Sequence, residues 1–252
     1  MENLYTAQDM RVKPYKKEFT YSYTEGVFPT VELIENAPDT VVKVLVSSKS
    51  NNNTGVALLK EGLVRGTWGN ISVRMDDKKM IVTPSGMDYI RMRPEDTVVV
   101  DIETLEYDSP VKPTSEKKIH AAILRDRPEI NAVIHSHPVW SSAVAAARKT
   151  MPSITPRMKE LVGEDVRTGD YGLPSTKKLT EGAVKALKDR NACFLANHGI
   201  FVCGKTMEEA FEIMREMEYC SKLYIDNMVK EELGKEEVTI DDVIEVFYKK
   251  IK

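Results

Sequence analysis

The chain has 252 residues, of which 42% are hydrophobic and 30% are charged, a composition typical of soluble globular proteins. Its net charge of −3 argues against nucleic acid or an anionic membrane as a partner, and no apolar stretch is long enough for a membrane helix. The three cysteines have no CxxC spacing and the first residues lack a hydrophobic signal core, so we expect a reducing, cytoplasmic location.

The predicted elements mix strands with helices along the chain. A β-branched strand over 41–48 is followed by a polar turn over 49–55. The hydrophobic patterns then predict a helix over 56–63, a glycine-bearing turn over 65–70, strands over 71–75, 80–85 and 98–103, a helix over 115–128, a strand over 130–135 and a helix over 141–149.

The C-terminal half continues this mixture. A helix is predicted over 173–190, capped by Ser175 or Thr176, and two strands lie within 192–204. Thr206 and Glu209 form a capping box that begins a long amphipathic helix, and a short helix over 240–252 follows it. Because several strands are arranged as hairpins, the sequence predicts an α/β fold with a largely antiparallel sheet.

Three of the four histidines stand where predicted strands end. His135 and His137 are one residue apart, so on a strand they face the same side about 7 Å apart. His198 lies between two strands, where Gly199 lets the backbone turn tightly. Three neutral imidazoles form an open zinc site that leaves a position for substrate. The alternative is that these rings are ordinary hydrogen-bonded polar groups at strand ends.

Glu116 favours the metal interpretation. It lies in the first turn of the predicted helix over 115–128, where the helix dipole favours an anion. A carboxylate beside a divalent metal serves as a fourth ligand or as a base, whereas the alternative is an ordinary acidic residue at a helix start. His120, four residues later on the same helical face, is interpreted as a supporting or structural residue and not as a ligand.

Three turns, over 66–70, 83–86 and 113–116, combine hydroxyl, amide and backbone N–H groups. Such turns bind anions without a lysine, and the third adds a helix N-terminus. Each turn alone is explained by local backbone structure. Together they predict a phosphate-sized anion site beside the proposed metal.

Five segments, in this order and at these intervals, resemble the class II aldolase/adducin family: GLVRGTWGNISVR, IVTPSGM, KPTSEKKIH, NAVIHSHP and ANHGIFVCG. The resemblance covers residues 56–228. It implies a three-layer α/β/α sandwich and a homotetramer with active sites between subunits. Residues 1–55 are then an atypical N-terminal extension, and residues 229–252 are a helical tail.

The resemblance also implies the site residues. His135, His137 and His198 are the expected zinc ligands, although another divalent ion fits the same chemistry. Glu116 is the expected acid/base residue, which also touches the metal. The expected contacts to the substrate phosphate come from Thr67, Asn70, Ser85, Gly86, Thr114 and Ser115.

The activity implied by the resemblance is cleavage of a ketose phosphate to dihydroxyacetone phosphate and an aldehyde, through an enediolate that the metal stabilises. Glu116 removes or returns the proton at the carbon beside the carbonyl. Glutamate at this position resembles the aldolase branch, because the epimerase branch carries aspartate there. The substrate partner is therefore a phosphorylated sugar.

Two departures from the family pattern leave alternatives open. Fuculose-type aldolases place a tyrosine from the next subunit near the segment that is 152–161 here, and this chain has none there. Arg157 or Lys159 is an alternative proton donor. An epimerase, dehydratase or decarboxylase with the same site, and an adducin-like interaction module without catalysis, remain alternative functions.

The second departure is the N-terminus. Residues 16–50 resemble the opening of TrmH-like RNA methyltransferases, but the methyl-donor domain that follows in those proteins is absent from this sequence. The basic arm would predict RNA affinity that depends strongly on salt, and the acidic overall charge argues against it. The extension is instead expected to be an added strand, an oligomer contact or a disordered arm.

Overall fold

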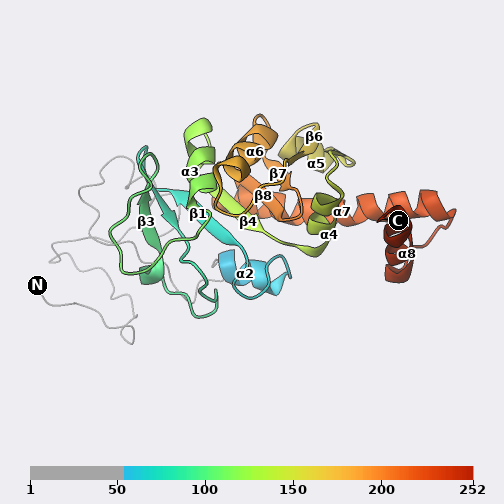
Figure 1. Ribbon diagram of the computed structural model, residues 1–252, viewed down its shortest axis with the longest axis horizontal. Coiled ribbons are helices and arrows are strands. Elements are labelled where there is room, and N and C mark those ends of the chain that lie inside the picture. The colour runs from blue at the N-terminus through green and yellow to red at the C-terminus, as the bar shows by residue number, and fades with distance from the viewer. Residues whose placement is uncertain (1–53, 252) are drawn as a thin grey trace, which may run out of the picture. The chain divides into compact units, whose positions relative to one another are not determined.

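The computed structural model describes residues 54–251, which form a mixed sheet covered by helices (Figure 1). The described strands follow the order β3-β2-β1-β4-β8-β7-β6-β5, and only β6 and β7 are parallel neighbours. The strands are β1 Asn70–Arg74, β2 Lys79–Val82, β3 Val98–Asp101, β4 Ala132–Ser136, β5 Met151–Pro152, β6 Asp165–Gly169, β7 Ala192–Leu195 and β8 Gly199–Gly204. The expected α/β fold with a largely antiparallel sheet is confirmed.

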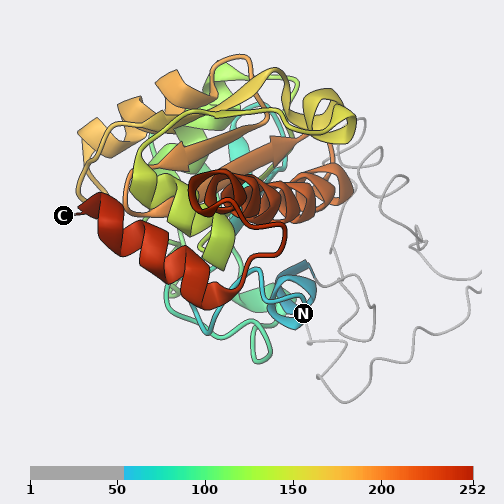
Figure 2. The same ribbon diagram turned by 90° about the vertical axis from the view of Figure 1, so that its right-hand side faces the viewer.

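Helices pack against both faces of this sheet. Figure 2 shows α3 and α6 on one side of the strands and α4 and α7 on the other. Two separate hydrophobic cores fill the spaces between the three layers, as the α/β/α architecture requires. The helices are α2 Thr54–Lys60, α3 Lys117–Asp126, α4 Val139–Ala147, α5 Pro156–Val162, α6 Lys177–Leu187, α7 Met207–Leu233, α8 Ile240–Ile251 and the 3₁₀ helix η2 Pro94–Asp96.

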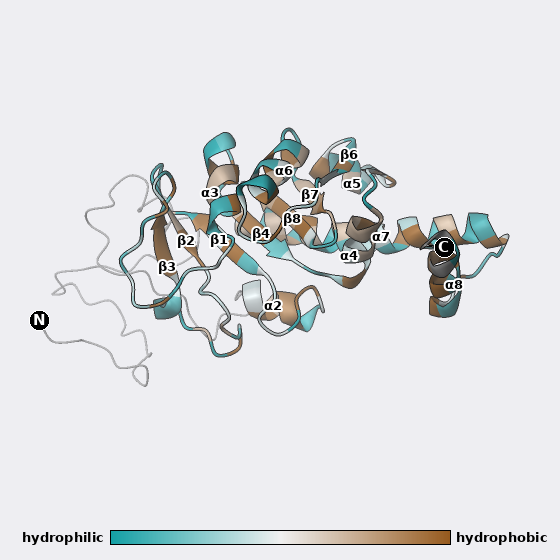
Figure 3. Cartoon of the chain, in the orientation of Figure 1, coloured by the Kyte–Doolittle hydropathy of each residue, from teal (hydrophilic) through white to brown (hydrophobic). Residues whose placement is uncertain are grey.

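The alternation of side chains along β4 determines toward which helical layer His135 points. Ala132 and Ile134 belong to the core beneath α4, α5 and α7, whereas Val133 belongs to the core beneath α3 and α6. Successive side chains of a strand point to opposite faces, so His135 points toward the α3 side. In Figure 3, β2 and β3 are largely brown, whereas α3 and α6 carry both colours, as expected for helices that pack on a core with one face.

Some element boundaries differ from the sequence expectation. The helix expected over 115–128 begins at Lys117, so Glu116 occupies the N-cap position before the helix and not its first turn. The helix expected over 173–190 begins at Lys177, because the Thr176 side chain accepts the backbone N–H of Leu179 and caps it. The β5–α5–β6 segment, residues 151–169, was not predicted as structured elements.

The predictions for the N-terminal segment concern residues that the structure does not describe. The strand over 41–48, almost all of the turn over 49–55 and the resemblance over 16–50 lie outside the described residues. At the other end, α7 continues to Leu233 across the boundary expected at 228/229. The division into extension, catalytic domain and tail therefore stays a prediction.

The described part of the chain has no helix that is both long and apolar enough to cross a membrane. The three cysteines, Cys193, Cys203 and Cys220, are free and buried. Burial raises the pKa of Cys203 and of Cys220 to about 12, so both are neutral thiols near pH 7.

Candidate metal centre and substrate pocket

Two neighbouring strands bring the three expected histidines together. β4 pairs antiparallel with β8, and His135 stands opposite Phe201 in this ladder. The end of β4, with His137 just beyond it, therefore lies beside the start of β8. His198 occupies the turn that leads into β8. One nitrogen of each imidazole lies within 4.8 Å of the others. Three nitrogens bound to one tetrahedral zinc ion at bond lengths of 2.0–2.1 Å are about 3.3 Å apart, a spacing that falls inside this limit.

The ring nitrogens are available for a cation. Nδ1 of His135 lies 2.9 Å from the backbone oxygen of Ile200, which can only accept, so Nδ1 carries the proton and Nε2 has a free lone pair. His135 Nε2 and His137 Nδ1 are both buried without a hydrogen-bond partner. Burial, with neighbouring positive charge second, lowers the pKa of His135 and His137 to about 3. Neutral, unpaired imidazoles are the form that binds a divalent metal.

Gly199 serves this cluster in a way that differs from the expectation. The left-handed residue of the β7–β8 turn is Asn197, with φ of 57°, and not Gly199. A Cβ on Gly199 would lie 2.5 Å from the backbone oxygen of Ser136 and 2.7 Å from Cδ2 of His137. Glycine is therefore needed because β8 passes close to the histidines, and the tight turn is made two residues earlier, at Asn197.

Glu116 places a carboxylate against two of the three histidines. Its Oε2 lies 3.1 Å from Nε2 of His135, and its Oε1 lies 3.4 Å from Nε2 of His198. Neither contact has the geometry of a hydrogen bond, since Oε1 and His135 Nε2 are both without a hydrogen-bond partner. The backbone N–H of Glu116 donates to Oγ1 of Thr114 at 3.3 Å. Three unpaired polar atoms, one anionic and two on neutral rings, fit a cation among them.

Asn70 holds the other side of the Glu116 carboxylate. It stands opposite His135 in the β1–β4 ladder, and its Nδ2 donates to Glu116 Oε2 at 2.9 Å. His120 does not reach the histidine cluster and instead bonds Asn70 and Ser72, which agrees with its interpretation as a supporting residue. Sequence reasoning missed this link because about fifty residues separate His120 from both partners.

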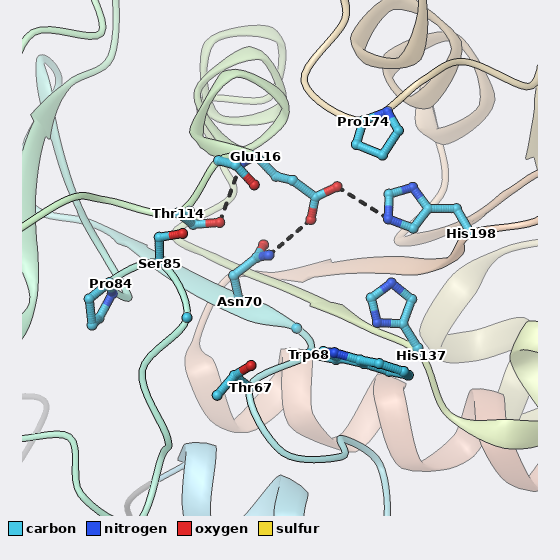
Figure 4. A pocket seen from close by; sticks show the side chains of 13 residues that line it. Thr67, Trp68, Asn70, Pro84, Ser85, Thr114, Glu116, His137, Pro174 and His198 are labelled. Atoms are coloured by element: carbon cyan, nitrogen blue, oxygen red, sulfur yellow. Dashed lines mark hydrogen bonds and ion pairs between the residues drawn. The ribbon is translucent and has the colours of Figure 1, made fainter.

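An open pocket of about 210 Å³ lies in front of this cluster (Figure 4). Every residue expected to contact phosphate lines it, together with Glu116, His137 and His198. Trp68 and Pro174 also line the pocket and were not singled out from the sequence, although Trp68 stands within the GTWGN turn. The lining is Thr67, Trp68, Gly69, Asn70, Pro84, Ser85, Gly86, Thr114, Ser115, Glu116, His137, Pro174 and His198.

The polar groups of the pocket divide into two sets. The side chains of Thr67, Ser85 and Ser115 are exposed toward solvent, and Gly86, with φ of 70°, turns the backbone beside them. Thr114 and Asn70 are buried and already bond Glu116. The exposed set beside the N-terminal end of α3 is free to donate to an anion. In the buried set, Asn70 donates to the Glu116 carboxylate, and Thr114 accepts the backbone N–H of Glu116.

The alternative proton donors do not reach this pocket within the chain. Arg157 pairs with Glu212 and, at 2.9 Å, with Glu160, while Lys159 pairs with Glu164 at 2.9 Å. Both basic side chains belong to α5, which packs against α7 in the other helical layer. Neither lines the pocket.

Comparison with known proteins agrees with this geometry. The sequence profile described as the Class II Aldolase and Adducin N-terminal domain matches residues 53–225. The chain belongs to the class II aldolase/adducin family. The family expected from the five motifs is confirmed, as is the expectation of an aldolase-type lyase.

Three relatives illustrate the similarity. The 5-methylthioribulose-1-phosphate/5-deoxyribulose-1-phosphate aldolase of Rhodospirillum rubrum is 37% identical over 65% of this chain and 73% of its own. The L-fuculose phosphate aldolase of Escherichia coli is 31% identical over 70% of this chain and 81% of its own. A solved L-fuculose 1-phosphate aldolase structure, 33% identical, superposes with a TM-score of 0.67 over 82% of this chain and 98% of that one.

Proposed function

We propose that the protein is a divalent-metal-dependent aldolase that cleaves a ketose 1-phosphate to dihydroxyacetone phosphate and an aldehyde. The observation that carries this proposal is the convergence of three imidazoles and the Glu116 carboxylate at one end of a pocket lined by hydroxyl and backbone donors. The aldolase relatives support the reaction class.

In this proposal His135, His137 and His198 hold the metal, with zinc as the expected ion, and Glu116 lies within reach of it. A divalent ion bound there supplies Lewis acidity, which stabilises negative charge on the substrate's carbonyl oxygen. The hydrogen bond from His135 Nδ1 to Ile200 fixes the ring so that Nε2 faces the site. Asn70 fixes the carboxylate in the same way.

The phosphate is proposed to bind at the N-terminal end of α3. Thr67, Ser85 and Ser115 offer hydroxyl groups, and Gly86 gives close access to backbone N–H groups. Among the described residues the pocket lining contains no lysine or arginine, so helix-end and backbone donors are proposed to recognise the anion. Asn70, also expected as a phosphate contact, is proposed to act through Glu116, because its amide bonds Glu116 and His120. Thr114 accepts the backbone N–H of Glu116, and its O–H is proposed to donate to the phosphate.

Glu116 is proposed to move the proton at C3 of the substrate. In cleavage the C3–C4 bond breaks, the C4 hydroxyl loses its proton to water, and C4 becomes the aldehyde carbonyl. The electron pair stays with C3, and Glu116 takes up a proton from solvent and delivers it to C3 to complete dihydroxyacetone phosphate. In the synthetic direction the carboxylate removes that proton. Its Oε1 suits this role because no protein donor occupies it.

The assembly and location are proposed with the function. We expect a homotetramer with active sites between subunits, in the cytoplasm. Large apolar side chains near the pocket mouth support a subunit contact there, since Trp68 is 67% exposed and Leu173 is 62% exposed. The free cysteines support a reducing compartment. Analytical ultracentrifugation of the full chain tests the tetramer directly.

The test is to incubate zinc-loaded protein with a panel of ketose 1-phosphates and to trap dihydroxyacetone phosphate with a coupled reductase. The panel includes 5-deoxyribulose 1-phosphate, 5-methylthioribulose 1-phosphate and L-fuculose 1-phosphate, the substrates named for the relatives. Release of triose phosphate from at least one member is expected. Conversion of a sugar phosphate without triose phosphate would instead identify an epimerase, dehydratase or decarboxylase.

The alternative reactions, epimerisation, dehydration and decarboxylation, are retained because residues 152–161 lack the tyrosine of fuculose-type aldolases. An interaction module without catalysis makes a different prediction, because it needs no metal. Protein purified without chelator and containing almost no divalent metal would favour the module. Near-stoichiometric metal would exclude it.

A further inference from the structure

A hydrogen-bonded chain runs from the sheet to the Glu116 carboxylate through His120. The His120 ring is fully buried between α3 and the strands. Its Nδ1 lies 2.6 Å from Oγ of Ser72, and its Nε2 lies 2.5 Å from Oδ1 of Asn70. Both ring nitrogens are therefore occupied by protein partners, and neither is left to bind a metal or substrate.

The direction of each hydrogen bond follows from the last acceptor. Nδ2 of Asn70 donates to Glu116 Oε2, so the amide oxygen of Asn70 faces His120. His120 therefore carries its proton on Nε2, and its Nδ1 accepts from the hydroxyl of Ser72. Every donor in the chain points toward Glu116. Complete burial lowers the pKa of His120 to about 3, so this tautomer is not replaced by the imidazolium near neutral pH.

Among the described residues, this series of hydrogen bonds is what orients the Glu116 carboxylate. Of its two oxygens, only Oε2 accepts a hydrogen bond, and the donor is Asn70. Oε1 has no hydrogen-bond partner and faces His198 at 3.4 Å. An asparagine amide held only at one end can rotate, whereas His120 holds the other end. The His120 bond therefore restricts the amide to the orientation that donates to Glu116.

We propose that His120 is a positioning residue, which fixes the Glu116 carboxylate through Asn70 and so keeps Oε1 directed at the reacting carbon and the metal. This inference rests on the proposed function for its catalytic meaning. The geometric claim, that Glu116 loses its orientation without the His120 donor, does not depend on the reaction. His120 itself does not line the pocket and is not one of the three histidines that converge there.

Two amide substitutions separate the donor from general effects of the change. In His120→Gln the side-chain amide nitrogen reaches the position of Nε2 and still donates to Asn70. In His120→Asn the shorter amide reaches only the position of Nδ1, so it keeps the Ser72 contact and loses the donor. The two variants match in polarity and differ by one methylene, which makes each the control for the other.

The activity readout is the exchange of the C3 proton of dihydroxyacetone phosphate for solvent deuterium, followed by NMR at saturating substrate. We expect His120→Asn to exchange ~10–100-fold more slowly at unchanged metal content and unchanged KM, and His120→Gln to stay within about threefold of the starting protein. Addition of Asn70→Ala to His120→Asn should cost little beyond Asn70→Ala alone, because both act on one bond. Equal rates in the two His120 variants, or additive losses in the double variant, would overturn the proposal.

A crystal structure of each metal-loaded variant separates this inference from the proposed function. We expect the Glu116 carboxylate to be rotated or to occupy several orientations in His120→Asn, and to keep its position in His120→Gln. If the starting protein exchanges no proton, the proposed function fails, yet the two structures still decide the positioning claim. An unchanged Glu116 in His120→Asn would refute it whatever the activity.

Discussion

Replacement of Glu116 by glutamine separates metal binding from proton transfer. Glutamine has nearly the same shape, and its side-chain oxygen can still accept the Asn70 bond that Oε2 accepts now. The amide NH₂ group then replaces Oε1, which has no hydrogen-bond partner among residues 54–251. The three histidines are untouched. We therefore expect Glu116→Gln to fold and to bind metal but to lack the base.

The size of the effect follows from what is removed. A positioned acid/base group contributes ~10²–10⁴-fold to the rate, which corresponds to about 2.7–5.4 kcal/mol at 1.36 kcal/mol for each factor of ten. Since no protein hydrogen bond to Oε1 is lost, the free energy of unfolding should change by less than about 1 kcal/mol. The prediction is a large loss of rate with little loss of stability.

The assay measures deuterium incorporation into dihydroxyacetone phosphate, together with metal content by mass spectrometry and the thermal midpoint of unfolding. Glu181→Gln is the control, because Glu181 belongs to α6 and forms an exposed pair with Lys177. This control should match the starting protein in all three measurements. Full exchange activity in Glu116→Gln would refute the assigned acid/base role, and loss of metal would show that Glu116 is an essential ligand.

Three further predictions concern the metal centre. His135→Ala and His198→Ala should each purify without metal, measured by elemental mass spectrometry; retention of a full equivalent by either would contradict the ligand set. Gly199→Ala should destabilise the protein by about 1–3 kcal/mol in denaturant titration and weaken metal binding, since its Cβ would lie 2.7 Å from His137; unchanged stability would show that β8 can move aside. Burial lowers the pKa of His120, His135 and His137 to about 3, against about 6.5 when unfolded, so the unfolded chain binds more protons between these values. The free energy of unfolding of the metal-free protein should therefore fall as pH falls below about 6.5. This fall should be less steep in His120→Gln than in the starting protein. Identical pH profiles for the two proteins would contradict the burial of a neutral His120.

The histidine site could be predicted because its signals are local. An HxH pattern places His135 and His137 on one face of a strand by covalent geometry alone. The motif order then indicates the family, and the family places His198 and Glu116 with them. The fold class follows equally from alternating hydrophobic patterns, since His135 comes at the end of a strand whose residues alternate between two cores.

What the sequence did not reveal depends on contacts between distant residues or on weak local patterns. The link from Ser72 through His120 to Asn70 spans about fifty residues and has no periodic signature. β6 was missed because only Val166 and Gly169 of its five residues are buried, so it shows no two-residue alternation. The N-cap position of Glu116 depends on where α3 begins, and helix boundaries are set by tertiary contacts as much as by local sequence.

The role of Gly199 shows the same limit. The sequence predicts a glycine turn, whereas the structure shows a left-handed Asn197 and a glycine required for close packing. Only the position of β4 beside β8 makes a side chain at 199 impossible without movement, and that pairing is not visible locally.

Zinc K-edge X-ray absorption on the protein as purified measures the ligand environment without any assumed substrate. The account predicts nitrogen or oxygen ligands at about 2.0–2.1 Å with the outer-shell scattering of three imidazoles. His198→Ala, which is expected to purify without metal, should give no zinc edge. A spectrum without imidazole scattering, or one dominated by sulfur, would contradict the metal centre on which the proposed catalysis depends.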